Sequence, residues 1–396
     1  MTPLALSNFS LVTCLGAGRA ATLAALRAGR SGLAPCSFDT LPLDAYAGEV
    51  AGLAAQGFAG EWAGFDCRNN RLAAQALALD GFSASVAAAK ARYGATRIGV
   101  FVGTSTSGIL QTETAYRERD AAGWLPPAFD YARTHNTYAL GRFVRSYLGL
   151  TGPAFAVSTA CAATSKVFAS AARMIAAGLC DAAIVGGVDT LCATTLFGFH
   201  ALGVMASGPC RPFDAARNGI SIGEAAGFAL LERPGPRQDP ETVLLLGTGE
   251  SSDAYHMSLP HPQGAGAKRA MDLALADAGL APGEIDYINL HGTATLAGDA
   301  AEDCAVASLF GGAVPCSSSK GFTGHTLGAS GVVGAAVSAL ALQHGFMPGS
   351  PHTNRVDPDF GINYVLEGRP ARINRVLSNA FGFGGVNCSL VLGRAA

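Results

Sequence analysis

The sequence predicts an α/β protein built from two related halves. Short apolar stretches typical of buried strands alternate with longer, alanine-rich stretches typical of helices along the whole chain. The proline-rich run at residues 233–240 is the best candidate for a linker, and it divides the chain into residues 1–235 and 236–396. In each half a strand leads into a helix near a reactive residue, Cys161 or His325, and another strand follows. This repeated order indicates an internal duplication.

The individual elements follow from local composition. In the first half, apolar runs predict strands at residues 9–14, 97–103, 155–157, 182–188 and 228–231, and alanine-rich runs predict helices at 19–29, 70–79 and 162–178. Residues 111–138 are expected to form a long excursion over one face. In the second half, we expect strands at 242–247, 285–290, 314–318 and from 376 onward, and helices at 266–278 and 299–310. A Gly-Gly-Val-Asp/Asn sequence recurs at 186–189 and 384–387, but four residues are too few to establish the duplication alone.

The composition narrows the class of protein. Charged residues make up 14% of the chain, against about 25% in ordinary globular proteins. Such a chain buries much of its surface against itself or a like subunit. The formal net charge is only −2, so the sequence lacks the basic balance of a nucleic-acid-binding protein and no nucleic-acid partner is expected.

The ten cysteines are scattered, and no pair has the spacing of a zinc site, so a reducing, cytoplasmic location without a metal is expected. The first basic residue is Arg19, and the N-terminus therefore lacks the charged region of a signal peptide. Residues 321–354 carry no Asp, Glu, Lys or Arg, but glycines and His325 and His344 interrupt them. We predict a buried helix there rather than a membrane span.

A glycine-rich sequence near the N-terminus offers one alternative function. Residues 16–21 read Gly-Ala-Gly-Arg-Ala-Ala and match the pattern of a dinucleotide-binding turn, with Asp39 near the place of a ribose-binding acid. However, Pro35 interrupts the strand that should present Asp39. The match to a nicotinamide site is therefore weak.

Cys161 is the candidate nucleophile. It follows the apolar residues 155–157 and precedes the predicted helix, so it lies where a strand turns into a helix. The positive end of a helix dipole favours a thiolate by about 0.3–1 kcal/mol, and by up to ~2 kcal/mol when partly buried. At about 1.4 kcal/mol per unit, this lowers a thiol pKa by up to roughly one unit. A buried structural cysteine is the ordinary alternative, and a histidine partner would decide between them.

Two histidines occupy similar junctions. His291 ends the predicted strand 285–290, and His325 lies at the start of a helix. Strand ends of parallel α/β sheets face the site crevice. Either histidine alone would more often be a satisfied core residue, but two histidines and a cysteine at such junctions indicate one site. The glycine-rich turn around Phe383 supplies unblocked backbone N–H groups, as an oxyanion hole requires.

Six motifs together resemble the elongating β-ketoacyl-acyl-carrier-protein synthases, the type I and II ketosynthases. They are Ser158-Thr-Ala-Cys161, Arg211-Pro-Phe-Asp214, Gly223-Glu-Ala-Ala-Gly227, His291-Gly-Thr-Ala-Thr295, Lys320-Gly-Phe-Thr-Gly-His325 and Gly382-Phe-Gly-Gly385. The resemblance implies a thiolase-like fold of two βαβαβαββ halves in five α-β-α-β-α layers. It also implies an acyl carrier protein partner and a homodimer, or a heterodimer with a chain-length-factor-like subunit. Other segments of the sequence resemble those of the ketosynthases of aryl-polyene pigment clusters.

The resemblance also implies a role for each site residue. Cys161 would carry the acyl chain, and His291 and His325 would hold the enolate formed when malonyl carrier protein loses carbon dioxide. Lys320 would support His325; a buried ion pair with Glu302 is the ordinary structural interpretation of this lysine and is compatible with that role. Phe383 would gate malonate entry, and Thr293 and Thr295 would bind the pantetheine arm. No metal or resident cofactor is needed, since the substrates travel on phosphopantetheine.

One departure and three alternatives accompany this expectation. The family often has an acidic residue nine positions after His325, where this chain has Gly334. The main alternative is a non-catalytic chain-length-determining partner of a ketosynthase, which would lack the reactive cysteine. A coenzyme-A-dependent thiolase or type III synthase would use a different residue set from Cys161 and two histidines. The dinucleotide enzyme is the last alternative.

Overall fold

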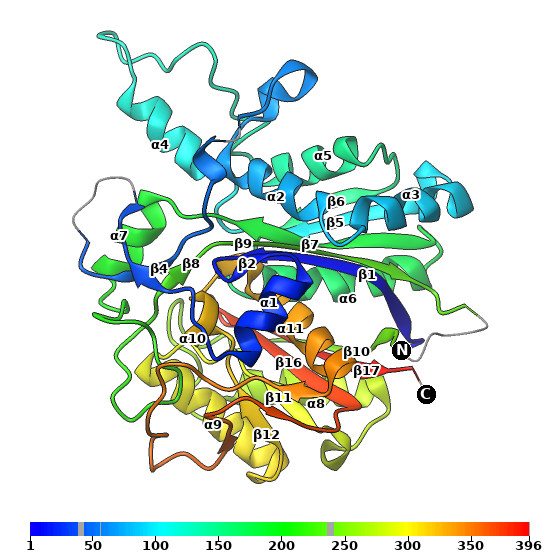
Figure 1. The fold of residues 1–396 in the computed structure, drawn as a ribbon, viewed down its shortest axis with the longest axis vertical. Helices are drawn as coiled ribbons and strands as arrows, with labels where there is room; N and C mark the ends of the chain where they lie inside the picture. The colour runs from blue at the N-terminus through cyan, green and yellow to red at the C-terminus, as the bar shows by residue number, and fades with distance from the viewer. Residues whose placement is uncertain (39–42, 56, 236–240, 396) are drawn as a thin grey trace.

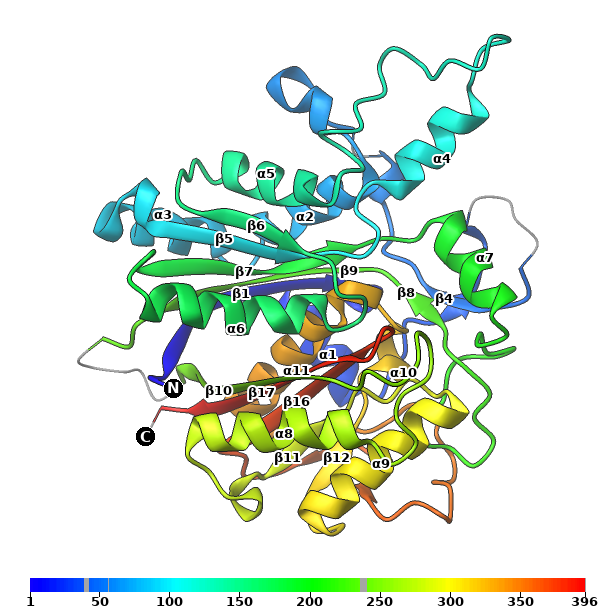
Figure 2. The same cartoon turned by 180° about the vertical axis from the view of Figure 1, so that it is seen from behind.

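The two halves of the chain form two layers of sheet that lie one above the other (Figures 1 and 2). The computed structural model describes residues 1–38, 43–55, 57–235 and 241–395. The principal strands of the first half are β1 (Leu4–Thr13), β5 (Ile98–Gly103), β6 (Ala154–Val157), β7 (Ala182–Asp189) and β9 (Ala225–Glu232). Those of the second half are β10 (Val243–Ser252), β11 (Tyr287–Asn289), β12 (Pro315–Ser317), β16 (Arg375–Gly382) and β17 (Val386–Arg394).

The strand order confirms the predicted duplication. The first half runs β6-β5-β7-β9-β1 in space, and the second half runs β12-β11-β16-β17-β10. If the strands of each half are numbered along the chain, both orders read 3-2-4-5-1. The two layers join where β1 pairs antiparallel with β10 through residues 4–6 and 243–245. The two halves therefore have the same strand order and the same crossovers, as expected for an internal duplication.

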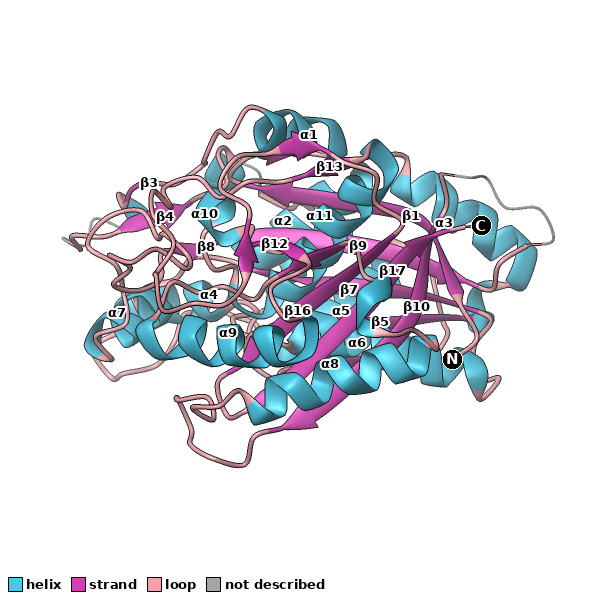
Figure 3. Ribbon diagram, turned by 90° about the horizontal axis from the view of Figure 1, so that it is seen from below, coloured by secondary structure: helices cyan, strands magenta, loops and turns pink. Residues whose placement is uncertain are grey.

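Helices complete a five-layer arrangement. The helices of the first half are α1 (Arg19–Arg27), α2 (Arg68–Ala78), α3 (Phe82–Tyr93), α4 (Ile109–Arg117), α5 (Thr137–Tyr147), α6 (Ala163–Ala176) and α7 (Ala193–Ala201), and those of the second are α8 (Ala265–Ala278), α9 (Leu296–Phe310), α10 (Lys320–Thr323) and α11 (Ser330–His344). Figure 2 shows α2, α3 and α5 outside the first sheet, α6 and α11 between the sheets, and α8 and α9 outside the second sheet. From below, α8 and α9 cover the second sheet (Figure 3).

The short strands are peripheral to this core. They are β2 (Gly16–Ala17), β3 (Ala34–Pro35), β4 (Tyr46–Gly48), β8 (Ile222–Gly223), β13 (Phe346–Met347), β14 (Asn363–Tyr364) and β15 (Arg369–Pro370). Of these, β8 pairs with β4, and Ile222 bridges to His325. The small sheet therefore holds the backbone of one site histidine.

The middle layer explains the uncharged stretch of the sequence. All thirteen residues from Ser330 to Leu342 of α11 are buried, because both sheets cover the helix. The segment Leu327–His344 is long and apolar enough to cross a membrane, yet 89% of it is buried inside the protein. A helix that is apolar on every side and enclosed in this way is a core helix. The prediction of a buried helix is confirmed.

Three sequence expectations need correction or limits. The Gly-Gly-Val-Asp/Asn recurrence does not reflect the duplication, because Asp189 ends β7 whereas residues 384–387 lie at the turn from β16 into β17. The predicted excursion at 111–138 is present, but α4 (Ile109–Arg117) at its start projects from the body instead of lying over one face (Figure 1). Asp39 and residues 236–240 of the expected linker lie outside the described residues, so the division at 235 stays a prediction.

Candidate active site

Cys161 lies two residues before α6, at the turn that follows β6. Ala160 has a φ of 49°, which turns the chain sharply between strand and helix. The Cys161 side chain is only 5% exposed. Burial raises its thiol pKa to about 11, although Lys320 and the backbone N–H of Phe383 both act to lower it. The predicted junction is confirmed, but the predicted lowering of the pKa is wrong because desolvation outweighs the helix dipole.

His325 is the direct partner of that sulfur. Its Nε2 lies 3.0 Å from Cys161 Sγ, and the Leu327 backbone N–H donates to its Nδ1 at 3.2 Å. Because a backbone N–H can only donate, Nδ1 must be the unprotonated nitrogen and the proton of the neutral ring sits on Nε2. Burial lowers the pKa of His325 well below its ordinary value, and the nearby Lys320 charge lowers it further. The ring therefore presents an N–H to the sulfur and to the space beside it.

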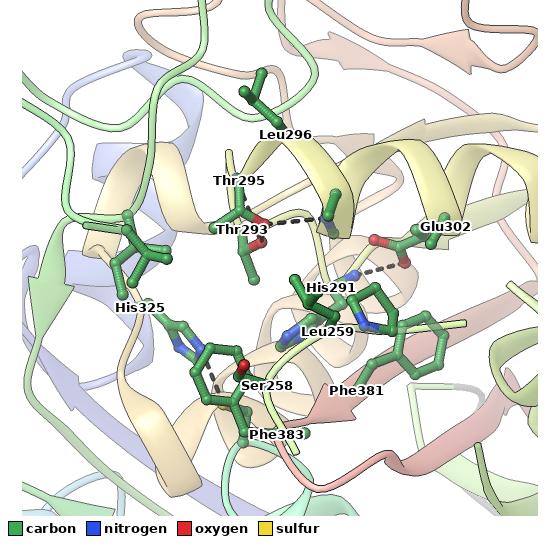
Figure 4. A pocket seen from close by; sticks show the side chains of 18 of the residues that line it. Ser258, Leu259, His291, Thr293, Thr295, Leu296, Glu302, His325, Phe381 and Phe383 are labelled. Carbon is green, nitrogen blue, oxygen red and sulfur yellow. Dashed lines mark hydrogen bonds between the residues drawn. The ribbon is translucent and has the colours of Figure 1, made fainter. Parts of the chain in front are cut away.

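His291 lies next to His325, with ring centroids 5.4 Å apart and planes at 85°. Glu302 on α9 accepts the His291 N–H at 2.8 Å and the Gly292 N–H at 2.7 Å, and so holds the backbone that carries the ring (Figure 4). Burial, together with the charge of Lys320, lowers the pKa of His291 well below its ordinary value. This ring is therefore also neutral.

Lys320 contacts His291 rather than His325. Its Nζ donates to the His291 carbonyl and lies 3.3 Å from His291 Nδ1. An ammonium can only donate, so it places the His291 proton on Nε2 as well. The expected support of His325 is corrected, because Lys320 reaches that ring only through its charge. The suggested ion pair with Glu302 is not a close contact among the described residues: that carboxylate accepts two backbone N–H groups and the Asn379 amide, and it acts on Lys320 only through its charge.

The three reactive atoms form a compact cluster. One atom each of Cys161, His291 and His325 lies within 4.8 Å of the other two, and all three residues are buried. Cysteine and histidine are zinc-binding residue types. Metal ligation through Nε2, however, requires a neutral ring protonated on Nδ1, and Leu327 and Lys320 place donors at both Nδ1 atoms. The hydrogen bonds therefore favour an anion between the two Nε2–H groups over a cation.

A cavity of about 260 Å³ opens onto this cluster. Its walls are mostly apolar, and Thr293 and Thr295 line it together with the three reactive residues. The two threonine hydroxyls lie 2.9 Å apart, and Thr295 also accepts the Gly298 N–H at the start of α9. Phe383 is 37% exposed at the pocket and packs beside Phe199, with ring centroids 5.8 Å apart. The structure thus brings together all the site residues that the sequence indicated.

The position of the missing acidic residue is filled by a neutral pair. A Cβ at Gly334 would lie 2.7 Å from Asn289 Nδ2 and 2.8 Å from Ser378 Oγ, and these two side chains are 3.3 Å apart. A carboxylate side chain at 334 would collide with them. Asn289 and Ser378 therefore take the place that the family often gives to an acid.

Two supporting residues escaped the sequence reasoning. The sequence indicates Glu302 only as an ion-pair partner and does not point to Ser330, whose hydroxyl lies 2.9 Å from His325 Nδ1. The signal for Glu302 was available, because three acids, Asp299, Glu302 and Asp303, lie in an alanine-rich helix whose other residues are mostly apolar. Ser330 gave no comparable signal, since serine is common at the start of helices.

The fold and the Cys-His-His cluster define a thiolase-like protein. The N-terminal domain model of β-ketoacyl synthase matches residues 2–235, and the C-terminal domain model matches residues 243–354. The chain belongs to the β-ketoacyl synthase family, which confirms the resemblance.

Individual relatives and solved structures agree with this assignment. The chain is 34% identical over 304 residues to nodulation protein E of Rhizobium meliloti, covering 75% of each. It is 34% identical over 311 residues to 3-oxoacyl-[acyl-carrier-protein] synthase 2 of Staphylococcus aureus, covering 75% of this chain and 77% of that protein. The ketosynthase ApeO, solved with its chain length factor ApeC from Xenorhabdus doucetiae, is 36% identical with a TM-score of 0.89, covering 100% of this chain and 98% of that chain. The ishigamide ketosynthase/chain length factor is 30% identical with a TM-score of 0.91, and both chains are covered completely.

Proposed function

We propose that this protein is an acyltransferase of the 3-oxoacyl-[acyl-carrier-protein] synthase type, which joins a malonyl unit to an acyl chain with loss of carbon dioxide. The proposal rests on one observation: Cys161 Sγ lies 3.0 Å from His325 Nε2, and the neutral imidazole of His291 lies beside them. A sulfur can hold an acyl group there, and two N–H donors can hold an enolate. Both needs of a decarboxylative condensation are present in one pocket.

The first step transfers the acyl chain. The Cys161 sulfur attacks the thioester carbonyl of an acyl carrier protein, the pantetheine sulfur leaves, and the proton lost by Cys161 ends on that leaving sulfur. With Nδ1 occupied by the Leu327 N–H, His325 acts as a hydrogen-bond donor to the developing thiolate rather than as a base. The N–H groups of Cys161 and Phe383 face the sulfur. They are the donors we assign to the tetrahedral oxyanion.

The second step generates the carbon nucleophile. Malonyl carrier protein enters the pocket, its carboxylate leaves as carbon dioxide, and the electron pair moves into an enolate on the thioester. The Nε2–H groups of His291 and His325 hold the enolate oxygen. Lys320 beside the His291 Nδ1 strengthens this donor, and its charge adds to burial in lowering the pKa of both rings and keeping them neutral. Such preorganised donors supply a large part of the rate acceleration in many enzymes.

The third step forms the carbon–carbon bond. The enolate carbon attacks the acyl-Cys161 carbonyl, the tetrahedral intermediate collapses, and the Cys161 thiolate leaves. The product is a β-ketoacyl chain, two carbons longer, on the carrier protein. Thr293 and Thr295 line the pocket and are the residues we assign to the pantetheine arm, and Phe383 is the residue we assign to its gate. The residues need no cofactor of their own for these steps.

We also propose acyl carrier protein as partner, with a second copy or a chain-length-factor-like subunit completing the enzyme. The complexes named for ApeO and the ishigamide ketosynthase support a heterodimer. We place the chain in fatty-acid or polyene elongation, and the aryl-polyene assignment stays a prediction. The non-catalytic alternative is disfavoured because Cys161 and both histidines are present and assembled.

The test is the mass of the acyl-enzyme after incubation with a panel of acyl carrier proteins. The proposal predicts a mass increase equal to one acyl group, located on the peptide that contains Cys161 and absent from Cys161→Gln. Cerulenin should block the same cysteine. Failure of every acyl donor and of cerulenin to modify Cys161 in the assembled protein would instead support a non-catalytic partner.

A further inference from the structure

Asp189, at the end of β7, is a buried carboxylate that the proposed mechanism does not use. Its Oδ1 accepts hydrogen bonds from the Thr104 hydroxyl, the Ser105 N–H, and both the N–H and the hydroxyl of Thr106, at 2.7–2.9 Å. Its Oδ2 accepts the Ala329 N–H at 3.1 Å. Because Asp189 has no exposed surface, each of these bonds replaces a lost contact with water. The carboxylate therefore ties the loop after β5 to the segment around Ala329.

That segment carries the donor that orients His325. The short helix Leu327–Ala329 begins two residues after His325, and Leu327 has a φ of 51°. A positive φ is costly for leucine, so surrounding contacts must hold it. This conformation points the Leu327 N–H at His325 Nδ1. The proton of the imidazole consequently sits on Nε2, toward Cys161.

Contacts around Gly328 limit how far the segment can move. The Thr164 hydroxyl, in the first turn of α6, donates to the Gly328 carbonyl at 2.6 Å. A Cβ at Gly328 would lie 2.7 Å from Asp189 Oδ2, so the segment packs directly on the carboxylate. Asp189 and Thr164 thus hold the two residues that follow Leu327.

We propose that Asp189 is a positioning residue for the condensation: through the Ala329 N–H it holds the Leu327–Ala329 turn, and through that turn it fixes the tautomer and orientation of His325. The inference rests on the role proposed above for the Nε2–H of His325. A residue at the end of a strand in the first half would thus position a catalytic histidine of the second half. Asp189 itself touches neither Cys161 nor the imidazole in any hydrogen bond of the described structure.

One substitution separates the two sides of the carboxylate. In Asp189→Asn, the amide oxygen should occupy the Oδ1 position, where four donors converge, which leaves the amide NH₂ at Oδ2 facing the Ala329 N–H. Two donors then face each other, and only the tie to the His325 segment is broken. Thr104→Val is the matched control, because it removes one donor to Oδ1, together with the acceptor of the Ser107 N–H in the same loop, and leaves the Ala329 bond. Ala329→Pro breaks the same tie from the other side, together with the bond that the Ala329 N–H donates to the Thr326 carbonyl at 3.0 Å, and its φ of −73° suits proline.

The assay combines activity with a direct reading of the ring. Carbon dioxide release from malonyl carrier protein is measured in a Cys161→Gln background, and ¹⁵N NMR of histidine-labelled protein reports the tautomer, with His325 assigned by its loss in His325→Ala. For Asp189→Asn we expect kcat to fall about tenfold or more with KM nearly unchanged, and the His325 signals to shift away from a pure Nε2–H form. Thr104→Val should change neither. Ala329→Pro should reproduce both effects and replaces Asp189→Asn if that variant does not fold.

Two results would overturn the inference: a folded Asp189→Asn protein with wild-type kcat and wild-type His325 signals, or an equal loss in Thr104→Val, which would indicate general loosening. The proposed function fails separately. If the Cys161→Gln protein with intact Asp189 releases no carbon dioxide, the role of His325 in decarboxylation is wrong, while the NMR signals still test the positioning by Asp189.

Discussion

Replacing His325 with alanine tests the centre of the proposed chemistry. The substitution removes one of two N–H donors aimed at the enolate oxygen and the only imidazole within hydrogen-bonding distance of Cys161 in the described structure. Loss of one such donor typically costs about 10²–10³ in rate, or ~2.7–4 kcal/mol of transition-state stabilisation. We therefore expect carbon dioxide release from labelled malonyl carrier protein to fall by about that factor. Acyl transfer to Cys161 should slow as well. Burial raises the pKa of the thiol to about 11, and without His325 the developing thiolate lacks its nearest hydrogen-bond donor.

His291→Ala provides the contrast. It should reduce carbon dioxide release by a similar factor but leave modification of Cys161 by an acyl donor close to wild type, because His291 is not the ring hydrogen-bonded to the sulfur. His344→Ala is the matched control, since this histidine is exposed at the end of α11. If His325→Ala released carbon dioxide within about threefold of the wild-type rate, the enolate could not depend on its Nε2–H, and the reasoning from tautomers would be refuted.

Three further predictions follow from the same geometry. Cys161→Gln should keep malonyl decarboxylation and abolish chain extension, as measured by carbon dioxide release and by product mass; an extended product from this variant would contradict covalent catalysis. Lys320→Met removes a charge that lowers the pKa of both imidazoles, so their pKa values rise and the acid limb of the pH–rate profile should move to higher pH; an unmoved limb would show that burial alone keeps the rings neutral. Gly334→Ala places a Cβ 2.7 Å from Asn289 and 2.8 Å from Ser378, and should cost about 1–3 kcal/mol in urea unfolding; a variant as stable as wild type would show that this pair moves freely.

Much of the architecture was predictable because it depends on local patterns. Apolar runs placed the core strands to within a few residues, and the uncharged stretch around α11 could only be a membrane span or an enclosed helix. Strand order could not be predicted in this way, because the pairing of β1 with β10 involves residues more than 230 positions apart. The false Gly-Gly-Val parallel shows the same limit. A short sequence match carries no information about where in a sheet it lies.

The site was predictable in its membership but not in its contacts. Motifs named Cys161, His291, His325 and Lys320, yet they assigned Lys320 to the wrong histidine and missed the function of Glu302. Those details depend on the direction of side chains and on the position of backbone N–H groups, such as that of Leu327. A backbone N–H is present whatever the side chain, so the sequence does not reveal which ones face the site. The thiol pKa was misjudged for a related reason. The helix dipole is a local property, whereas desolvation depends on everything packed around the sulfur.

The duplication explains why nucleophile and donor meet. Cys161 and His325 each follow the third strand of their own half and precede its central helix, so they occupy equivalent places in the two copies. The helices α6 and α11 pack against each other between the sheets, and their first turns approach so closely that a Cβ at Gly331 would lie 2.3 Å from Ser165 Oγ. The Thr164 hydroxyl on α6 also accepts the Val332 N–H of α11 at 2.9 Å. Two equivalent junctions brought face to face in this way need only different side chains, a thiol in one and an imidazole in the other, to become a catalytic pair.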